Sequence, residues 1–185
     1  MSERICPWWI GYLLASPVRR MKQNPEEILG PYVKPGMKIL EIGPGMGFFT
    51  LPMARMVGEH GQIVCVDVQE KMIRNLLRRA RKAELSLRIV ARTCSTTSLH
   101  VEELVDTMDF VLAFAVVHEV PDTKKLFQEI HSSLKKGGRL LLAEPAGHVT
   151  QDGYQRTLAI AQAIGLSVVD SPKIPRSLSS LMVKG

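Results

Sequence analysis

The sequence contains few cysteines and no long apolar run, and both shortages exclude whole classes of protein. Three cysteines, Cys6, Cys65 and Cys94, are odd in number and widely separated, so they indicate neither a disulfide framework nor a Cys-x-x-Cys metal site. No apolar run reaches the length that a membrane-spanning helix needs. Residues 7–16 are apolar, but no clear small-residue cleavage site of a signal peptide follows them. We therefore expect a cytoplasmic protein with no metal site and no membrane span.

Aromatic residues are also scarce, at 5% of the chain, and do not alternate with basic residues along any predicted strand. This disfavours an RNA-binding surface, although a net charge of +6 and a pI near 9.4 can attract nucleic acid, anionic lipid or an acidic partner. One basic run holds Arg74, Arg78, Arg79, Arg81 and Lys82, on a predicted helix whose other face is apolar. A solvated outer face is the simplest interpretation of that run.

The 185 residues suffice for a single domain with a substantial core, which we predict over residues 1–185. Two apolar runs, 37–42 and 62–66, suit strands buried on both faces of a parallel sheet, and a helical pattern lies between them. Glu41 lies in the first run, and Asp67 directly follows the second. This order of strand, glycine turn, helix, strand and acid predicts a βαβ unit with a nucleotide-type site at its carboxyl edge.

The glycines of this unit alternate, at Gly43, Gly45 and Gly47. The dinucleotide-binding pattern G-x-G-x-x-G would place its third glycine at position 48, which is Phe48. A helix that opens on two phenylalanines leaves little room for a pyrophosphate at its N-terminal amides. Asp67 lies about twenty residues beyond the glycines, the usual place for an acid that binds ribose hydroxyls. The pattern favours a bulky ligand with a ribose and no phosphate, and glycines that serve packing alone are the alternative.

The segment Glu41-Ile42-Gly43-Pro44-Gly45-Met46-Gly47 resembles the first motif of class I S-adenosylmethionine-dependent methyltransferases, and Asp67 is similar to their ribose-binding acid. The resemblance extends from about residue 31 to the C-terminus. It implies S-adenosyl-L-methionine as the cofactor and an α/β fold, a Rossmann-like three-layer sandwich. Its mostly parallel seven-stranded sheet would have an antiparallel last strand between strands five and six. The residues expected at the cofactor are Glu41, Gly43, Pro44, Gly45, Gly47, Phe48, Asp67, Val68, Met72, Cys94, Ser95, Phe114 and Ala115.

The periodicity of the rest of the chain predicts a regular succession of elements. A short helix begins after Asn24 as its N-cap, and Asp122 caps a later helix that ends in a basic turn at Lys135 and Lys136. Further helices are expected over 47–57, 69–83, 98–105 (short and irregular) and 152–164. Strands are expected over 37–42, 62–66, 85–91, 108–116, 139–144, 166–170 and 178–183.

Residues 117–122, Val-His-Glu-Val-Pro-Asp, look like the loop after strand four in small-molecule methyltransferases of the quinone-biosynthesis and arsenite-methylating type. We expect His118, with Glu119 beside it, to act as the general base, and shaping of the pocket is its alternative role. Glu144 is a further residue that can face the substrate. The family often has an acid at the position of Cys94 or Ser95 that contacts the adenine amino group. This sequence departs from that pattern, and backbone groups or Ser95 could substitute for the acid.

Residues 1–36 precede the core at 37–185, and in related methyltransferases this segment often folds over the cofactor as a lid. We expect Trp8, Trp9 and Tyr12 to line the substrate pocket, with packing on outer helices or a dimer contact as the alternative. The partner implied by the resemblance is a small-molecule methyl acceptor, bound by a monomer or homodimer. An RNA methyltransferase and a non-catalytic S-adenosylmethionine-binding protein remain alternative functions.

Overall fold

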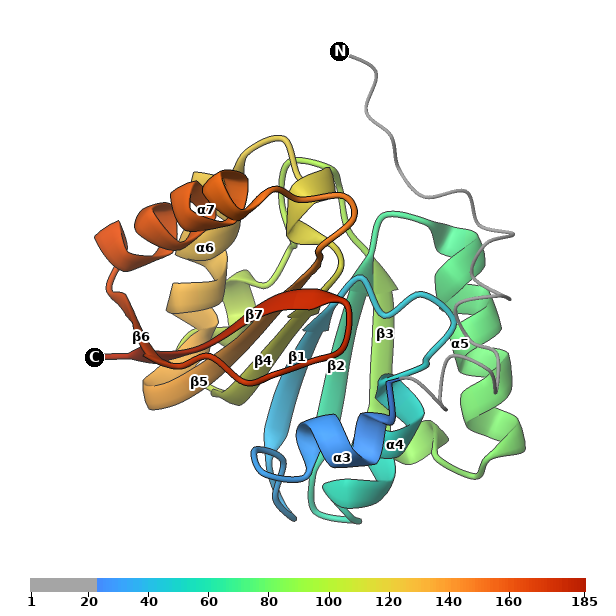
Figure 1. Ribbon diagram of the computed structural model, residues 1–185. Coiled ribbons are helices and arrows are strands. Elements are labelled where there is room, and N and C mark those ends of the chain that lie inside the picture. The colour runs from blue at the N-terminus through green and yellow to red at the C-terminus, as the bar shows by residue number, and fades with distance from the viewer. Residues whose placement is uncertain (1–22) are drawn as a thin grey trace. The chain divides into compact units, whose positions relative to one another are not determined.

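The computed structural model describes residues 23–185, which form two compact units that divide the sequence between Cys94 and Ser95 (Figure 1). In the unit that ends at Cys94, strands and helices alternate. They are α3 (Pro25–Leu29), β1 (Lys38–Ile42), α4 (Thr50–Met56), β2 (Gln62–Asp67), α5 (Glu70–Lys82), the 3-10 turn η1 (Ser86–Arg88) and β3 (Ile89–Thr93). The Asn24 side chain accepts the backbone N–H of Glu26 at 3.2 Å, so the predicted N-cap of α3 is confirmed.

Parallel pairing joins the three strands of this unit, with β2 between β1 and β3. Helix α5 packs along β2 and β3 (Figure 1) through its buried residues Met72, Ile73, Leu76 and Ala80. These positions recur every three or four residues, which places them on one helical face. Cys65 in β2 is fully buried and packs as a small apolar residue of the core.

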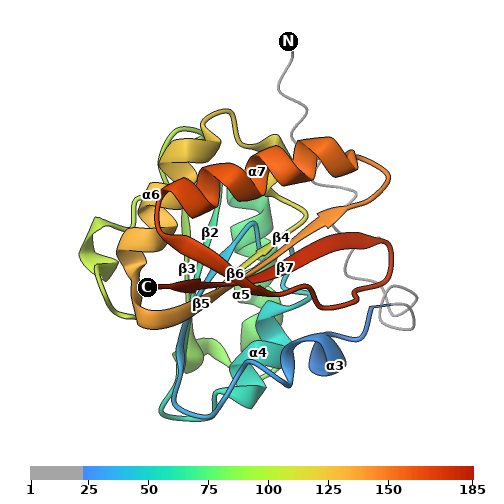
Figure 2. The ribbon, with the colours of Figure 1, turned by 60° about the vertical axis from the view of Figure 1, so that its left-hand side comes forward.

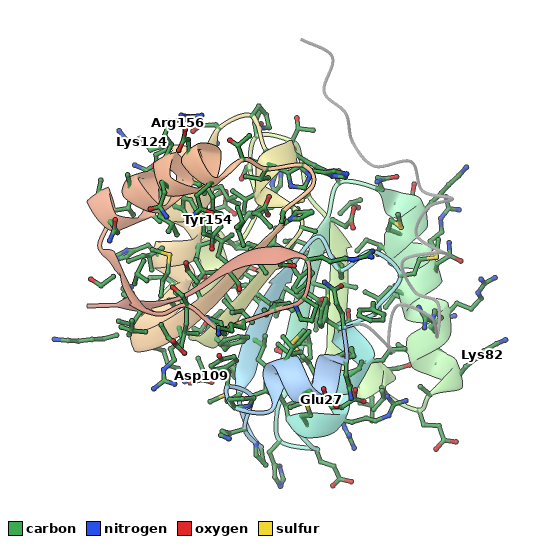
Figure 3. The ribbon with its side chains drawn as sticks, in the orientation of Figure 1. Glu27, Lys82, Asp109, Lys124, Tyr154 and Arg156 are labelled. Carbon is green, nitrogen blue, oxygen red and sulfur yellow. The ribbon has the colours of Figure 1, made fainter. Side chains whose placement is uncertain are left out.

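The unit that begins at Ser95 is built on a second group of strands. Its elements are η2 (Glu102–Leu104), β4 (Met108–Phe114), η3 (Val117–Glu119), α6 (Thr123–Ser133), β5 (Leu134–Pro145), α7 (Gln151–Ala163), β6 (Leu166–Asp170) and β7 (Ser177–Lys184). Helices α6 and α7 lie side by side over one face of these strands (Figure 2). Tyr154 points from α7 toward the sheet, where its hydroxyl donates to the Leu142 carbonyl at 3.4 Å, whereas Arg156 points outward (Figure 3).

Within the unit that ends at Cys94 the strand order is β3-β2-β1, and within the other unit it is β4-β5-β7-β6, which makes seven strands among the described residues. Strands β4 and β5 are parallel, and β7 runs antiparallel to both β5 and β6. The predicted α/β class, the mostly parallel sheet and the antiparallel last strand between strands five and six are therefore confirmed.

The predicted third strand over 85–91 began too early. Leu85 closes α5 instead, because its N–H donates to the Ala80 carbonyl at 2.9 Å, and η1 follows before β3 begins. The strand over 85–91 was predicted because apolar residues alternate at Leu85, Leu87 and Ile89, yet Leu87 is 99% exposed whereas Leu85 and Ile89 are buried. A 3-10 turn can expose one member of such an alternating set, so alternation over few residues did not identify a strand here.

Other boundaries also differ from the prediction: β4 ends at Phe114 and not at residue 116, and β5 begins at Leu134 and not at residue 139. Helix α6 ends at Ser133, and Lys135 lies in β5, where its Nζ bonds Asp109 Oδ1 at 2.6 Å, so the predicted basic last turn was wrong. The irregular helix over 98–105 is reduced to η2. The helix expected over 47–57 begins only at Thr50, because the positive φ of Gly47, 85°, is incompatible with α-helix. Asp122 caps α6 as expected, accepting the Lys125 N–H at 2.9 Å.

None of the helices within residues 23–185 combines the length and hydropathy that crossing a membrane requires.

Candidate active site

The glycine turn after β1 lies against the acid after β2. The N–H of Gly45 donates to Asp67 Oδ2 at 3.3 Å, and the N–H of Gln69 donates to the other carboxylate oxygen at 2.9 Å. Ile42 and Val66 are register partners, so parallel pairing brings both strand ends to the same edge. Asp67 is only 8% exposed, and its carboxylate is oriented by two backbone donors.

The alternating glycines serve different purposes. Gly45 has a φ of 55°, and a Cβ there would meet nothing within 4 Å, so the backbone borders open space. Gly47 has a φ of 85°, and a Cβ there would lie 2.6 Å from Cδ1 of Leu76 in α5. Gly45 therefore leaves room for a ligand, whereas Gly47 lets the turn pack against α5.

A guanidinium from α5 also holds the turn. Nη1 of Arg79 donates to the carbonyl oxygen of Met46, and burial lowers the pKa of Arg79. The interpretation of Arg79 as part of a solvated face was wrong, because helical position 79 turns toward the glycines.

Glu41 is a buried carboxyl group beneath this turn. It is 3% exposed, and Oγ1 of Thr50 donates to its Oε2 at 2.5 Å, with Sγ of Cys65 at 3.7 Å from the same oxygen. Burial raises the pKa of Glu41 to about 7, hydrogen bonds from Thr50 and Cys65 oppose that rise, and the charge of Asp67 adds to it. Near neutral pH, Glu41 is therefore in part a neutral acid.

The other predicted cofactor residues of this unit lie around Asp67 and the glycine turn. The Cys94 N–H donates to the Asp67 carbonyl at 3.1 Å, Val68 follows Asp67 on the surface, and Met72 is buried in the first turn of α5. Phe48 forms an edge-to-face pair with Phe49, with ring centroids 5.0 Å apart. Pro44 accepts the Gly47 N–H at 3.0 Å within the turn.

Ser95, Phe114 and Ala115 belong to the other unit. The Ser95 hydroxyl oxygen accepts the Thr97 N–H at 3.3 Å, and Ser95 forms a bridge with Ser98. Ser95 thus has hydrogen bonds of its own within a local turn. Phe114 is the last residue of β4, and Ala115 follows with its N–H bonded to the Ala143 carbonyl at 2.7 Å.

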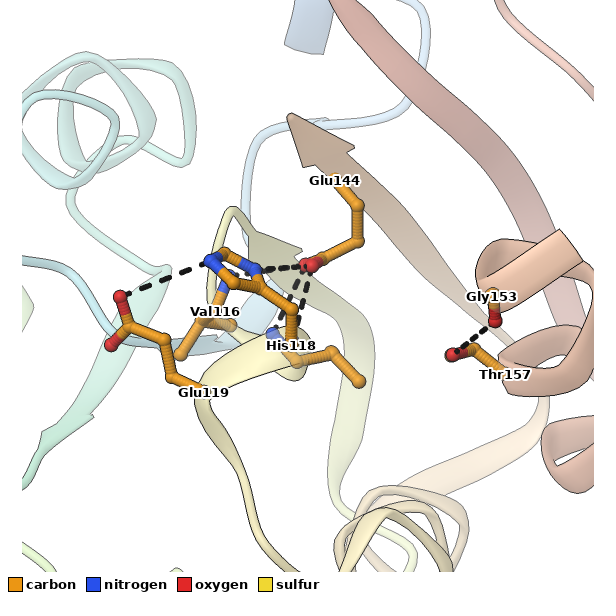
Figure 4. Close-up of polar contacts among 7 residues, drawn as sticks. Val116, His118, Glu119, Glu144, Gly153 and Thr157 are labelled. Atoms are coloured by element: carbon orange, nitrogen blue, oxygen red, sulfur yellow. Dashed lines mark hydrogen bonds and ion pairs between the residues drawn. The ribbon is translucent and has the colours of Figure 1, made fainter. Parts of the chain in front are cut away.

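His118 and Glu144 form the second polar cluster (Figure 4). Nδ1 of His118 lies 2.5 Å from Glu144 Oε2. The same carboxylate accepts the backbone N–H groups of Val116, Val117 and His118 at 3.0–3.1 Å. Glu144 is 2% exposed, so four donors surround a carboxylate that water scarcely reaches.

The chain forms this cluster through a sharp change of direction after β4. Ala115 has a φ of 58°, an uncommon value for a residue with a Cβ, and the following three N–H groups converge on Glu144. Glu144 lies near the end of β5, whose register pairs Ala143 with Phe114 of β4. Parallel pairing therefore places the acid beside the loop that carries His118.

The geometry of His118 suits proton transfer. Because Nδ1 faces a carboxylate, the neutral ring carries its proton there and leaves the Nε2 lone pair available. The hydrogen bond to Glu144 raises the pKa of His118, while partial burial opposes the rise and the Glu119 carboxylate adds to it. Oε1 of Glu119 lies 4.0 Å from Nε2, and the His118 side chain is 23% exposed.

Trp8, Trp9 and Tyr12 lie outside the described residues, as does most of the expected lid. Within residues 23–185, no group of three or more His, Cys, Asp and Glu side chains has the arrangement of a metal site.

Three partners were not predicted from the sequence. Glu144 was considered only as a residue that can face substrate, and Thr50 and Arg79 were assigned no role at the glycine turn. Each is separated in the chain from the residue it contacts, by 26, 9 and 33 positions respectively. Glu144 did give a signal, since an acid near the end of an apolar strand needs partners when buried.

The fold and the glycine turn with its acid define the class of protein, that of the class I methyltransferases. The family model described as a methyltransferase domain matches residues 33–172, so the chain belongs to that family. This confirms the resemblance inferred from residues 41–47 and Asp67.

Curated relatives are longer than this chain. It is 30% identical over 112 residues to the ubiquinone/menaquinone biosynthesis C-methyltransferase UbiE of Haemophilus ducreyi, covering 60% of this chain and 42% of that protein. It is also 30% identical over 133 residues to the carboxy-S-adenosyl-L-methionine synthase of Aliivibrio salmonicida, covering 70% and 52%. The chain thus spans about half the length of these relatives.

A solved structure of similar size shares the fold. The S-adenosylmethionine-dependent methyltransferase of Aquifex aeolicus matches with a TM-score of 0.84 over 97% of this chain and 100% of its own, at 22% identity.

Proposed function

We propose that the protein is an S-adenosyl-L-methionine-dependent methyltransferase that acts on a small molecule. The observation that carries the proposal is the contact of Gly45 with the oriented carboxylate of Asp67 beside open space. Membership of the methyltransferase domain family supports it, as do the named activities of the relatives.

The residues of the turn fit this cofactor. Asp67 presents a carboxylate, the acceptor group that ribose hydroxyls need, and the backbone N–H groups of Gly45 and Gln69 orient it. Gly45 allows a bulky group to approach the backbone, and the carboxylate of Asp67 complements a cationic ligand. The cofactor-binding set expected from the sequence, from Glu41 to Ala115, is therefore retained in the proposal, with Arg79 added as the residue that holds the turn.

When bound, the cofactor supplies a methyl group that is already activated on a sulfonium. The chain then has to align the acceptor, exclude water and, for a protonated acceptor, take up a proton. His118 is suited to receive that proton at Nε2, and Glu144 positions the ring through Nδ1. Glu119 lies close enough to Nε2 to stabilise the protonated ring.

A small-molecule acceptor is favoured over RNA by the loop that carries His118 and by the quinone-biosynthesis relatives. The two units would work as one methyltransferase domain, with residues 1–36 as the lid and Trp8, Trp9 and Tyr12 at the substrate. A cytoplasmic monomer or homodimer is proposed as the working form.

Calorimetry with S-adenosylmethionine on wild-type protein and on Asp67→Ala tests the cofactor site. Loss of charge-assisted hydrogen bonds to ribose should weaken binding by roughly 10- to 150-fold. Asp67→Asn should show a smaller loss, because one oxygen remains to accept a backbone N–H. Asp152→Ala, which removes an exposed acid of α7, should bind as wild type. Wild-type affinity in Asp67→Ala would show that the acid is misassigned.

Transfer of labelled methyl groups onto a panel of metabolites and RNAs then tests the activity. Labelling of a metabolite would support the proposal. Labelling confined to RNA would establish the nucleic-acid alternative, and cofactor binding without any transfer would favour a non-catalytic binding protein.

A further inference from the structure

Nearly all of the net positive charge of the protein is concentrated on α5. This helix carries six basic residues and one acid, a net charge of +5, whereas the net charge of the whole chain is +6. The remaining basic and acidic residues therefore almost cancel. The electrostatic field of this 13-residue helix should attract polyanions to the helix itself and not to the rest of the protein surface.

Five of these six cations face solvent along a single stripe. Their positions recur every three or four residues, opposite the buried face of α5, and the stripe extends over roughly 17 Å of helix axis. The members are Lys71, Arg74, Arg78, Arg81 and Lys82. Arg79, the sixth cation of α5, is not part of the stripe because it donates to the Met46 carbonyl. Lys82 projects away from the helix into solvent (Figure 3). We call these five residues the α5 stripe.

An exposed apolar side chain follows the stripe in the chain. Leu87 is 99% exposed at the centre of η1, five residues after Lys82. The turn that presents it is anchored, because buried Leu85 donates its N–H to the Ala80 carbonyl at 2.9 Å and Arg88 donates to the Ala54 carbonyl at 3.2 Å. A leucine held in solvent five residues after a run of cations would be buried favourably in an apolar phase with an anionic boundary.

We propose that the α5 stripe and Leu87 form a docking surface for an anionic lipid bilayer. The stripe would contact phosphate headgroups, to which guanidinium groups bind in bidentate fashion, and Leu87 would enter the acyl region. Single-stranded RNA is bound by stacking of bases on aromatic side chains, and residues 70–88 contain none. The combination of cations with an exposed leucine therefore favours lipid over nucleic acid. All of these residues belong to one unit, and the proposal does not depend on the methyltransferase activity.

Co-sedimentation of the full chain with lipid vesicles tests the proposal. We expect binding to phosphatidylcholine vesicles that contain about one third phosphatidylglycerol, none to phosphatidylcholine alone, and weakening as salt increases. Each cation near such a surface contributes about fivefold in affinity, so the triple variant Arg78→Gln, Arg81→Gln, Lys82→Gln should bind roughly 100-fold more weakly. Leu87→Ser should bind roughly tenfold more weakly with an unchanged salt dependence.

A matched variant removes the same charges elsewhere. Lys124→Gln, Arg139→Gln, Arg156→Gln takes one lysine and two arginines from exposed positions of the other unit, and should lose no more than about fivefold. Melting curves of all variants should overlay the wild type, because the changed side chains are exposed.

Three results would overturn the proposal. They are failure of the wild-type protein to bind anionic vesicles at low salt, equal losses in the two triple variants, and wild-type binding by Leu87→Ser. Salt-dependent binding to RNA without binding to vesicles would also overturn it, and would identify the α5 stripe as a nucleic-acid surface.

Discussion

Glu41→Gln should make the protein more stable above neutral pH and remove the part of the pH dependence of stability that Glu41 causes. Glu41 is buried under the glycine turn, and its pKa is raised from an ordinary value of 4.5 to about 7, chiefly by burial. Glutamine has the shape of the neutral acid and can still accept the Thr50 hydroxyl bond. It carries no charge that must be buried at any pH.

Proton linkage determines whether this group stabilises the protein at low or at high pH. A carboxyl group whose pKa is raised on folding binds more protons in the folded state, so its favourable contribution is present in full below pH 4.5 and is lost as pH rises to about 7. At about 1.4 kcal/mol per pH unit, the free energy of unfolding should fall by about 3 kcal/mol across that window. For a chain of this length, that loss corresponds to a fall of roughly 6–12 °C in Tm.

Urea unfolding and thermal melting at several values between pH 4.5 and pH 8 provide the measurement. Other groups also titrate in this range, so the informative quantity is the difference between wild type and Glu41→Gln as a function of pH. That difference should grow in favour of the variant as pH rises. Glu59→Gln, which neutralises an exposed acid of the same unit, controls for net charge and should follow the wild type. A constant difference at every pH would refute the linkage argument.

Two further predictions concern the second cluster and the glycines. Replacement of His118 by alanine should reduce transfer to a protonated acceptor by roughly 10²- to 10⁴-fold. The rate of the wild-type enzyme should rise with pH through the raised pKa of His118. Glu144→Gln should move that rise to lower pH, because the hydrogen bond to Glu144 is the main cause of the raised pKa. The same pH–rate profile in the variant and the wild type would contradict this role of Glu144. Gly47→Ala should destabilise the fold more than Gly36→Ala, by about 1–3 kcal/mol in urea unfolding. Both glycines have positive φ near 80°, but only the methyl group at position 47 would meet a buried side chain, that of Leu76. Equal losses of stability in the two variants would show that backbone strain at positive φ, and not contact with Leu76, determines the cost.

The sequence by itself determined the features that a few adjacent residues encode. The alternating glycines and Asp67 predicted the turn and the acid after β2, because glycine conformations and strand periodicity are local properties. Asn24 and Asp122 predicted two helix starts, since each caps its helix through a bond within three residues.

The tertiary structure alone decided which distant side chains meet. Glu144 reaches His118 because β4 and β5 pair in one register, and Arg79 reaches Met46 because α5 packs against the turn. The same holds for Leu87, whose exposure depends on where α5 closes and not on its hydrophobicity. Strand pairing and helix packing determine such contacts through interactions between residues that are tens of positions apart in the chain. A local sequence pattern therefore does not predict them.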